Sequence, residues 1–240
     1  MAAIKELGDI RTTIDDKREK SRKCIMEASL ALFYENGYQK TTIRDIIKKA
    51  GILNGSLYNR FKSKEEILLN IVTDMLHVTL KECETLLKDE RDMVVAAALP
   101  TALEIYVSSR SPKAADLIYE VHRLWSAVTE YRDMNTKWLK NYFERYGITL
   151  TNMLDADMSY LMLLGATGNI CGYYANGGTE DYRKVLRYLV LHIATGLKMP
   201  VFDIDSTLDK IISIMENCHI TLYEDGNDLM VLPPDTEAEN

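Results

Sequence analysis

The sequence predicts an all-α fold, with a small N-terminal helical domain followed by a larger helical domain. Apolar residues recur at three- and four-residue spacing along most of the chain, and no strand pattern is longer than a few residues. With 240 residues and 47% hydrophobic content, the chain can bury the core of one small and one larger domain. Charge divides in the same way, because residues 1–65 hold 14 Lys and Arg against 9 Asp and Glu, whereas the remainder is acidic. This asymmetry is expected where only the first domain meets a polyanion.

Residues 42–50 are predicted to form an amphipathic helix of about two turns. Thr42 can cap its N-terminus, with Asp45 three residues on as an acidic partner. Gly51 stands where this helix must end and the chain must turn, a conformation with positive φ that glycine adopts at the least cost. The apolar side of the helix consists of Ile43, Ile46, Ile47 and Ala50.

A second short helix is expected over residues 54–61, with Asn54 as its N-cap. Leu57 and Phe61 are four residues apart and therefore face the same core. Gly55 would let the start of this helix approach a sugar-phosphate backbone closely. The other face carries side chains that can reach base edges and phosphates in a major groove, namely Ser56, Tyr58, Asn59 and Arg60.

A third, long helix is predicted to begin at Ser63, which forms a capping-box pair with Glu66, and to continue to about residue 88. Its free backbone N–H groups, together with Lys62 and Lys64, suit a phosphate. Residues 41–66 thus have the layout of a helix-turn-helix DNA reader. The alternative is an ordinary packed helical hairpin, with Tyr58 as a core aromatic. Lys48 and Lys49 by themselves are expected to form a solvated face.

Residues from about 18 to 75 resemble the DNA-binding domain of the tetracycline-repressor (TetR) family. The resemblance covers roughly a quarter of the chain and implies a homodimeric repressor, with N-terminal helices that bind double-stranded operator DNA and a helical C-terminal domain that dimerises and often binds a small effector. Many members place a serine directly after the Gly-Ile pair, where this chain has Leu53, so capping is assigned to Asn54 and no contact to Leu53. The matching positions are Ile25, Ala28, Phe33, Gly37, Tyr38, Thr41, Thr42, Ile43, Ile46, Ala50, Gly51, Ile52, Gly55, Ser56, Leu57, Tyr58, Phe61, Lys64 and Leu68.

Three regions follow from these observations and the resemblance. A helix-turn-helix DNA-binding domain is expected over 18–78, a helical effector-binding and dimerisation domain over 79–225, and a disordered, acidic tail over 226–240. The candidate DNA contacts are Thr42, Arg44, Asn54, Gly55, Ser56, Tyr58, Asn59, Arg60, Lys62 and Lys64.

The second domain is predicted as a series of helices separated by breaks. Helices are expected over 91–110 and 112–146, with Pro112 between them and a further break near Thr129. Gly147 ends that run. After a break at Met199 and Pro200, a last helix is expected over 203–223, with its apolar positions at Leu208, Ile211, Ile212, Met215, Cys218 and Leu222.

Residues 158–179 contain no charged side chain, which on length alone would suit a membrane span. Polar residues and glycines dilute this segment, so we expect instead a helix that another helix approaches closely. It is followed by a helix over 182–197, and the two form half of a four-helix bundle that, by the resemblance, a second subunit completes. The alternative is that both pack inside one monomer. The predicted dimer interface is Gly165, Gly168, Gly172, Leu186, Leu189 and Ile193.

Aromatic residues are concentrated in the middle of the chain, where they could line a pocket for a small, partly apolar effector. Tyr119, His122 and Trp125 are spaced three apart and share one helix face. The alternative is that these residues form plain core. The candidate effector contacts are Tyr106, Tyr119, His122, Trp125, Trp138 and Tyr142.

No catalytic motif appears in the sequence, and no cofactor is expected. His122 has no companion at metal-ligand spacing, and the four cysteines are far apart, so neither a metal site nor a disulfide is predicted. The first ten residues lack the apolar core of a signal peptide, which favours the cytoplasm. The helix-turn-helix pattern and the resemblance to the TetR family together imply a ligand-responsive transcriptional repressor. A helical binding or interaction module that does not touch DNA, and a helical enzyme, are the alternatives.

Overall fold

The computed structural model describes residues 2–88, 90–148, 153–199 and 203–216, together with residues 220–221 and 231–232. Within these residues the chain is helical apart from one pair of two-residue strands, which confirms the all-α prediction. The chain divides into two compact units, Met1–Ile71 and Val72–Asn240, and the boundary falls within one long helix.

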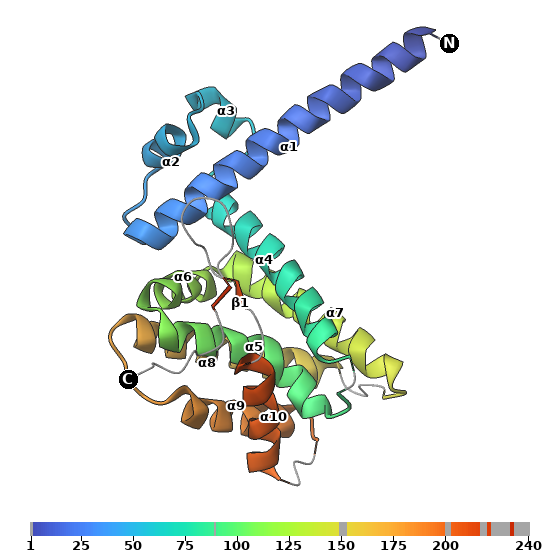
Figure 1. Ribbon diagram of the computed structural model, residues 1–240, viewed down its shortest axis with the longest axis vertical. Helices are drawn as coiled ribbons and strands as arrows, with labels where there is room; N and C mark the ends of the chain where they lie inside the picture. The colour runs from blue at the N-terminus through green and yellow to red at the C-terminus, as the bar shows by residue number, and fades with distance from the viewer. Residues whose placement is uncertain are drawn as a thin grey trace, which may run out of the picture. The chain divides into compact units, whose positions relative to one another are not determined.

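The first unit contains three helices and the start of a fourth (Figure 1). Its core is formed by large side chains that are fully buried, among them Phe33, Ile46, Leu57 and Ile67. The hydroxyl of Thr41 donates to the carbonyl oxygen of Leu32 at 3.1 Å and so fixes the turn after the first helix. The helices are α1 (Ala2–Asn36), α2 (Ile43–Ala50), α3 (Asn54–Tyr58) and α4 (Lys64–Leu86).

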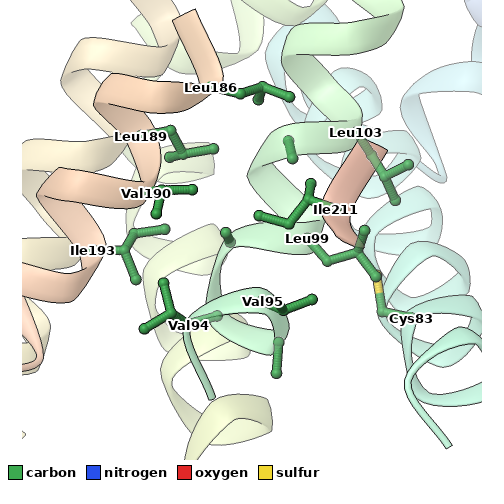
Figure 2. Packing of buried hydrophobic residues seen from close by; sticks show 14 of the residues in the cluster. Cys83, Val94, Val95, Leu99, Leu103, Leu186, Leu189, Val190, Ile193 and Ile211 are labelled. Carbon is green, nitrogen blue, oxygen red and sulfur yellow. The ribbon is translucent and has the colours of Figure 1, made fainter. Parts of the chain in front are cut away.

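The second unit is built around α5, which packs against α6, α8, α9 and α10. Figure 2 shows Leu186, Leu189, Val190 and Ile193 of α9 pointing toward the apolar side chains of α5, where Leu99 is fully buried. The elements of this unit are α5 (Met93–Arg110), α6 (Pro112–Arg123), α7 (Trp125–Arg145), α8 (Met153–Ala175), α9 (Tyr182–Gly196), α10 (Ile204–Glu216), β1 (Ile220–Thr221) and β2 (Val231–Leu232).

Two helix boundaries differ from the prediction. The break after Pro112 lies at Leu124, which is extended at φ −88° and ψ 113°, whereas Thr129 lies inside α7 and donates its hydroxyl to the carbonyl oxygen of Trp125 at 3.1 Å. No glycine, proline or capping side chain marks Leu124, so the sequence contains no signal for this break.

The last predicted helix is shorter than expected. Helix α10 ends at Glu216, and β1 pairs antiparallel with β2 in the register Ile220 to Leu232 and Thr221 to Val231. Two β-branched residues in succession, Ile220 and Thr221, favour a strand over a helix. Cys218 and Leu222, which were assigned to the helix, lie outside the described residues, as does the predicted disordered tail apart from β2. Among the described residues, no helix has the length and apolarity to cross a membrane.

Candidate nucleic-acid interface

Helix α2 is held at both ends by local interactions that the sequence predicts. The Oγ1 atom of Thr42 accepts the Asp45 backbone N–H at 3.3 Å, and the Asp45 carboxylate accepts the Thr42 backbone N–H at 2.9 Å. The Thr42 hydroxyl also donates to that carboxylate at 2.6 Å and is the main reason why the pKa of Asp45 is lowered. Gly51 ends the helix in the left-handed conformation, at φ 63°. The predicted capping box and glycine C-cap are thus confirmed.

Helix α3 begins one residue earlier than predicted, because the N-cap is Leu53 and not Asn54. Leu53 has an extended backbone, and its carbonyl oxygen accepts the N–H of Ser56 at 2.9 Å. Its side chain makes no capping hydrogen bond, since it has no polar atom. Asn54 is the first helical residue, so its side chain is on the helix surface and does not cap it.

Apolar residues anchor α3 on one side, and the opposite side is open. Leu57 is fully buried and Phe61 is 2% exposed, so their predicted burial is confirmed. Helix α3 ends at Tyr58, however, so Phe61 follows the helix and does not lie on it as predicted. Tyr58 is 54% exposed, so it is not the core aromatic of the packed-hairpin alternative. Asn54, Gly55 and Asn59 are exposed as well, whereas Ser56 and Arg60 are half-buried.

A groove lies between α2 and α3, and its rim carries positive charge. Arg44 and Lys48 are exposed, and the one carboxylate on α2, Asp45, is occupied by the N-cap of that helix. The adjacent Lys49 forms an ion pair with Glu35, since its Nζ atom lies 3.2 Å from the Glu35 carboxylate. The residues that line the groove are Thr42, Ile43, Arg44, Ile47, Lys48, Gly51, Ile52, Asn54 and Tyr58.

Lys64 differs from the prediction because its ammonium group faces its own chain. The Nζ atom donates to the carbonyl oxygen of Tyr38 at 2.7 Å and to that of Thr41 at 2.9 Å. It also lies 4.2 Å from the centroid of the Tyr38 ring, a cation–π contact. Lys64 therefore holds the start of α4 against the turn between α1 and α2, whereas Lys62 is exposed.

The predicted capping box at the start of α4 is only half formed. The Ser63 hydroxyl oxygen accepts the Glu66 N–H at 3.1 Å, as expected. The Glu66 carboxylate, however, accepts the backbone N–H of Lys62 at 2.6 Å. This N–H is thereby used within the chain, so Lys62 can offer only its side chain to a phosphate.

In the second unit, most of the predicted dimer residues face their own chain. A Cβ atom on Gly168 would lie 2.6 Å from the Cβ of His122, and one on Gly172 would lie 2.9 Å from the ring of Tyr119, so these glycines permit the close approach of α6 to α8. The three α9 residues are buried, at 0% for Leu186, 5% for Leu189 and 4% for Ile193. Of the predicted set, only Gly165 is exposed, with no atom near the position of a Cβ.

A different side of α8 and α9 exposes large apolar residues. The two helices are in contact, and His192 Nε2 lies 3.2 Å from the carbonyl oxygen of Ser159. Helix α8 is apolar almost all round, so periodicity alone does not separate its inner from its outer side. We call the outer set the α8–α9 face; its residues are Met158, Met162, Gly165 and Tyr173 on α8, with Tyr188 and Leu191 on α9.

The predicted effector residues have different neighbours in the part of the chain that the structure describes. Tyr106 is buried edge-on against Tyr182, with ring centroids 5.1 Å apart. Tyr142 stacks on Trp138 and donates its hydroxyl to the carbonyl oxygen of Glu90 at 2.9 Å, so it is a structural residue. The Trp125 side chain is 70% exposed. Tyr119 packs near Gly172, as described above.

His122 instead belongs to a half-buried polar cluster that sequence reasoning missed. Its Nε2 atom lies 2.9 Å from Oε2 of Glu104, and the His122 side chain is only 3% exposed. The rings of His122 and Tyr131 meet edge-on, with centroids 5.7 Å apart. Burial, and then the charge of Glu104, raise the pKa of Tyr131 and of Tyr160 well above the usual range. The available signal was the lone Glu104 within the otherwise apolar run of α5.

Tyr160 also borders a small cavity between four helices. The cavity volume is about 20 Å³, which is enough for one water molecule. Its lining is largely apolar and consists of Ala97, Thr136, Leu139, Ser159, Tyr160, Leu163, Ile193 and Leu197. The cluster of Glu104, His122, Tyr131 and Tyr160, which we call the Glu104 cluster, thus adjoins space that is not fully packed.

Comparison with known proteins relates the first unit to bacterial transcriptional regulators. Residues 25–71 match the family model described as "Bacterial regulatory proteins, tetR family". The chain is 27% identical over 199 residues to the HTH-type transcriptional repressor KstR2 of Rhodococcus jostii, an alignment that covers 78% of this chain and 96% of that protein. It is 42% identical over 52 residues to KstR2 of Mycolicibacterium smegmatis, covering 22% of this chain and 25% of that protein. For the mycobacterial relatives the alignment thus spans only a quarter to a third of their length.

Solved structures with the same fold cover most of the chain. The structure of RolR in complex with resorcinol has a TM-score of 0.57 at 16% identity, over 82% of this chain and 95% of that one. The structure of FadR from Bacillus subtilis in complex with stearoyl-CoA has a TM-score of 0.53 at 18% identity, over 72% of this chain and 98% of that one. At these identities the likeness concerns the fold.

Proposed function

We propose that this chain is a DNA-binding transcriptional regulator that represses its target genes until a small-molecule effector binds. The proposal starts from the membership of the chain in the TetR family of bacterial regulatory proteins. The observation that carries the proposal is the two-sided character of α3. Leu57 is buried on one side of the helix, and Phe61 is buried just after its end. Asn54, Gly55 and Tyr58 stay exposed beside a basic groove. An exposed helix with polar and cationic neighbours fits a major groove.

The proposed DNA contacts divide by their chemistry. Arg44, Lys48 and Lys62 would neutralise phosphates, with Thr42 and Arg60 at the edge of the surface. Asn54, Ser56, Tyr58 and Asn59 would meet base edges or the backbone. Gly55 would permit close approach, since nothing of its own chain lies within 4 Å of the position of a Cβ. We leave Lys64 out of the contact set because its ammonium is already bonded within the chain.

Dimerisation is proposed to use the α8–α9 face. Met162 at 68% exposure and Tyr188 at 74% exposure would leave a large apolar area in water in an isolated chain. A two-fold pairing of α8 and α9 would cover this area and form a four-helix bundle. To read a symmetric operator, such a dimer would need its two α3 helices roughly 34 to 36 Å apart, one for each half-site.

The effector is proposed to bind in the second unit next to the Glu104 cluster. A half-buried carboxylate beside a histidine and two tyrosines is costly to desolvate, and such clusters often mark functional sites. A mainly apolar ligand with one hydrogen-bonding group would suit the chemistry of the cluster. The apolar cavity beside it holds about one water molecule in this structure, so it would have to widen to admit such a ligand. Helix α4 belongs to both units, so a shift in its second half would be passed to the first unit along one continuous helix.

A gel-shift assay tests the DNA-binding proposal. The full chain is titrated onto duplex DNA from the region flanking its own gene, over a series of salt concentrations. We expect Tyr58→Ala and Arg44→Ala each to weaken binding about tenfold, and Arg44→Ala to reduce the slope of binding against salt by about one unit. Lys137→Ala, which removes an exposed positive charge from α7, is the matched control and should bind normally. Absence of binding at every salt concentration would instead favour a helical binding module that does not contact DNA.

A further inference from the structure

Leu53 is disfavoured at its position for two independent reasons. It is the N-cap of α3, where Ser, Thr, Asn or Asp would bond a free backbone N–H and leucine cannot. The residue is also 80% exposed, the highest fraction among the large apolar residues whose exposure the structure describes. The side chain of Leu53 therefore stabilises neither the helix start nor the core. Positions that break local rules without a compensating contact in the fold are commonly functional.

The surroundings of Leu53 indicate what could cover it. The residues on either side, Ile52 and Asn54, both line the groove between α2 and α3. Arg44 and Lys48 give this groove its positive rim, whereas the Asp45 carboxylate is held by Thr42. A basic surface of this kind complements a polyanion and opposes a cationic partner. An apolar partner for Leu53 is therefore expected within a polyanion, and in duplex DNA the major groove offers one apolar group on the bases.

That group is the C5-methyl of thymine, which projects into the major groove and is absent from the other three bases. We infer that Leu53 is a specificity-determining residue that packs against a thymine methyl in each operator half-site. This inference rests on the proposed DNA-binding function and refines it. Leucine has no donor or acceptor, so it reads the methyl by contact alone, while Asn54 and Tyr58 remain available for hydrogen bonds.

A methyl-deletion cycle tests the inference with the full chain. Operators are first selected in vitro from a pool of random duplexes. Each thymine is then replaced in turn by deoxyuridine, which lacks only the methyl group. For the native chain we expect one symmetric pair of thymines at which the loss of the methyl weakens binding, by about fourfold for one half-site and about fifteenfold for both.

The variant that completes the cycle is Leu53→Ala. It should bind the thymine and deoxyuridine operators equally at this one pair, while it keeps its response to substitutions at all other positions. Replacing that thymine by 5-methylcytosine, compared with cytosine, should restore part of the affinity of the native chain only. Equal sensitivity of Leu53→Ala and the native chain at every thymine, or no methyl sensitivity in the native chain, would overturn the inference.

Two further measurements distinguish a DNA contact by Leu53 from a role of this residue in folding or in dimerisation. Leu53→Ser should melt at the same temperature as the native chain or higher, because serine can cap α3; a lower melting temperature in both variants would assign Leu53 to folding and overturn the inference. Dissociation of the dimer by Leu53→Ala would show that a second copy covers the residue, which also overturns it. If the native chain selects no duplex at all, the proposed function fails with it, whereas normal operator binding without the methyl effect removes only the role of Leu53.

Discussion

The ammonium nitrogen of Lys64 lies 2.7 Å from the carbonyl oxygen of Tyr38, although 26 residues separate the two along the chain. This bond and the one to Thr41 satisfy two carbonyl groups at the end of the α1–α2 turn. Lys64→Met should therefore lower the free energy of unfolding by about 1.5–3 kcal/mol, the usual contribution of a hydrogen bond to a charged group. Urea denaturation followed by circular dichroism measures this change.

Lys62→Met is the control for Lys64, because Lys62 is exposed and lies two residues away. It should leave the unfolding midpoint unchanged and weaken DNA binding. If Lys64→Met leaves stability intact and instead weakens DNA binding as much as Lys62→Met does, then the Lys64 side chain acts at the DNA surface, contrary to its position in the structure.

Gly51 and Gly55 offer a matched pair of substitutions. Neither has an atom within 4 Å of the position of a Cβ, but Gly51 has a φ of +63° and Gly55 has no positive φ. Gly51→Ala should cost about 1–2 kcal/mol of stability, because an L-residue is strained in the left-handed region. Equal thermal midpoints for Gly51→Ala and the native chain would contradict the observed C-cap of α2.

Gly55→Ala should have the opposite pattern. Within its own chain the added methyl group meets only open space, and alanine favours a helix over glycine by up to about 1 kcal/mol. Thermal stability should therefore be kept or raised, while operator affinity should fall by about tenfold, because the methyl would push α3 away from the DNA backbone. A variant that binds DNA with native affinity would exclude close approach at this glycine.

Low pH should remove the contribution that the N-terminal cap of α2 makes to the stability of the fold. The pKa of Asp45 is lowered in the folded chain, chiefly by the hydrogen bond from the Thr42 hydroxyl. A depressed carboxyl pKa stabilises the fold above the unfolded value of about 3.9, and this stabilisation is lost as the pH falls through the folded value. The native chain should therefore melt above Thr42→Val at pH 7, and the gap should shrink below about pH 4. A gap that is constant between pH 7 and pH 3 would count against the Thr42–Asp45 bond as its source.

The α8–α9 face makes a prediction about assembly. Met162→Glu puts a charge into the proposed dimer interface, where an unpaired buried charge is strongly destabilising, so the chain should become monomeric at micromolar concentration. Val78→Glu changes another exposed apolar residue, 52% exposed on α4, and should leave the assembly unchanged. Sedimentation velocity distinguishes the two states. If the Met162→Glu chain sediments like the native dimer, the dimer interface does not include the α8–α9 face.

Local features of the first unit could be predicted from the sequence because their causes lie within a few residues. The Thr42–Asp45 cap, the Gly51 turn and the inward Leu57 and Phe61 all follow from short-range spacing. The bond from Lys64 to Tyr38 could not be predicted, since it joins distant positions. Nor could the N-cap at Leu53, because the backbone path of the turn decides which residue takes that place.

In the second unit, the sequence did not show which side of each helix faces the interior of the chain, and most of the wrong predictions there follow from this. Helix α8 is apolar on most sides, so its pattern could not show that Gly168 and Gly172 meet α6 of the same chain. The link between Glu104 and His122 joins two helices whose relative rotation no local rule fixes. Leu124 carries no breaking residue, and the helix boundary there was misplaced for that reason.

The central claim is that the exposed side of α3 lies against duplex DNA. Hydroxyl-radical footprinting of the full chain on the DNA flanking its gene tests it most directly, with the native chain and Tyr58→Ala compared at equal concentration. The account predicts two protected segments related by two-fold symmetry and about one helical turn apart, both weakened in Tyr58→Ala while the dimer stays intact. Uniform cleavage with the native chain, or the same protection with both chains, would contradict it.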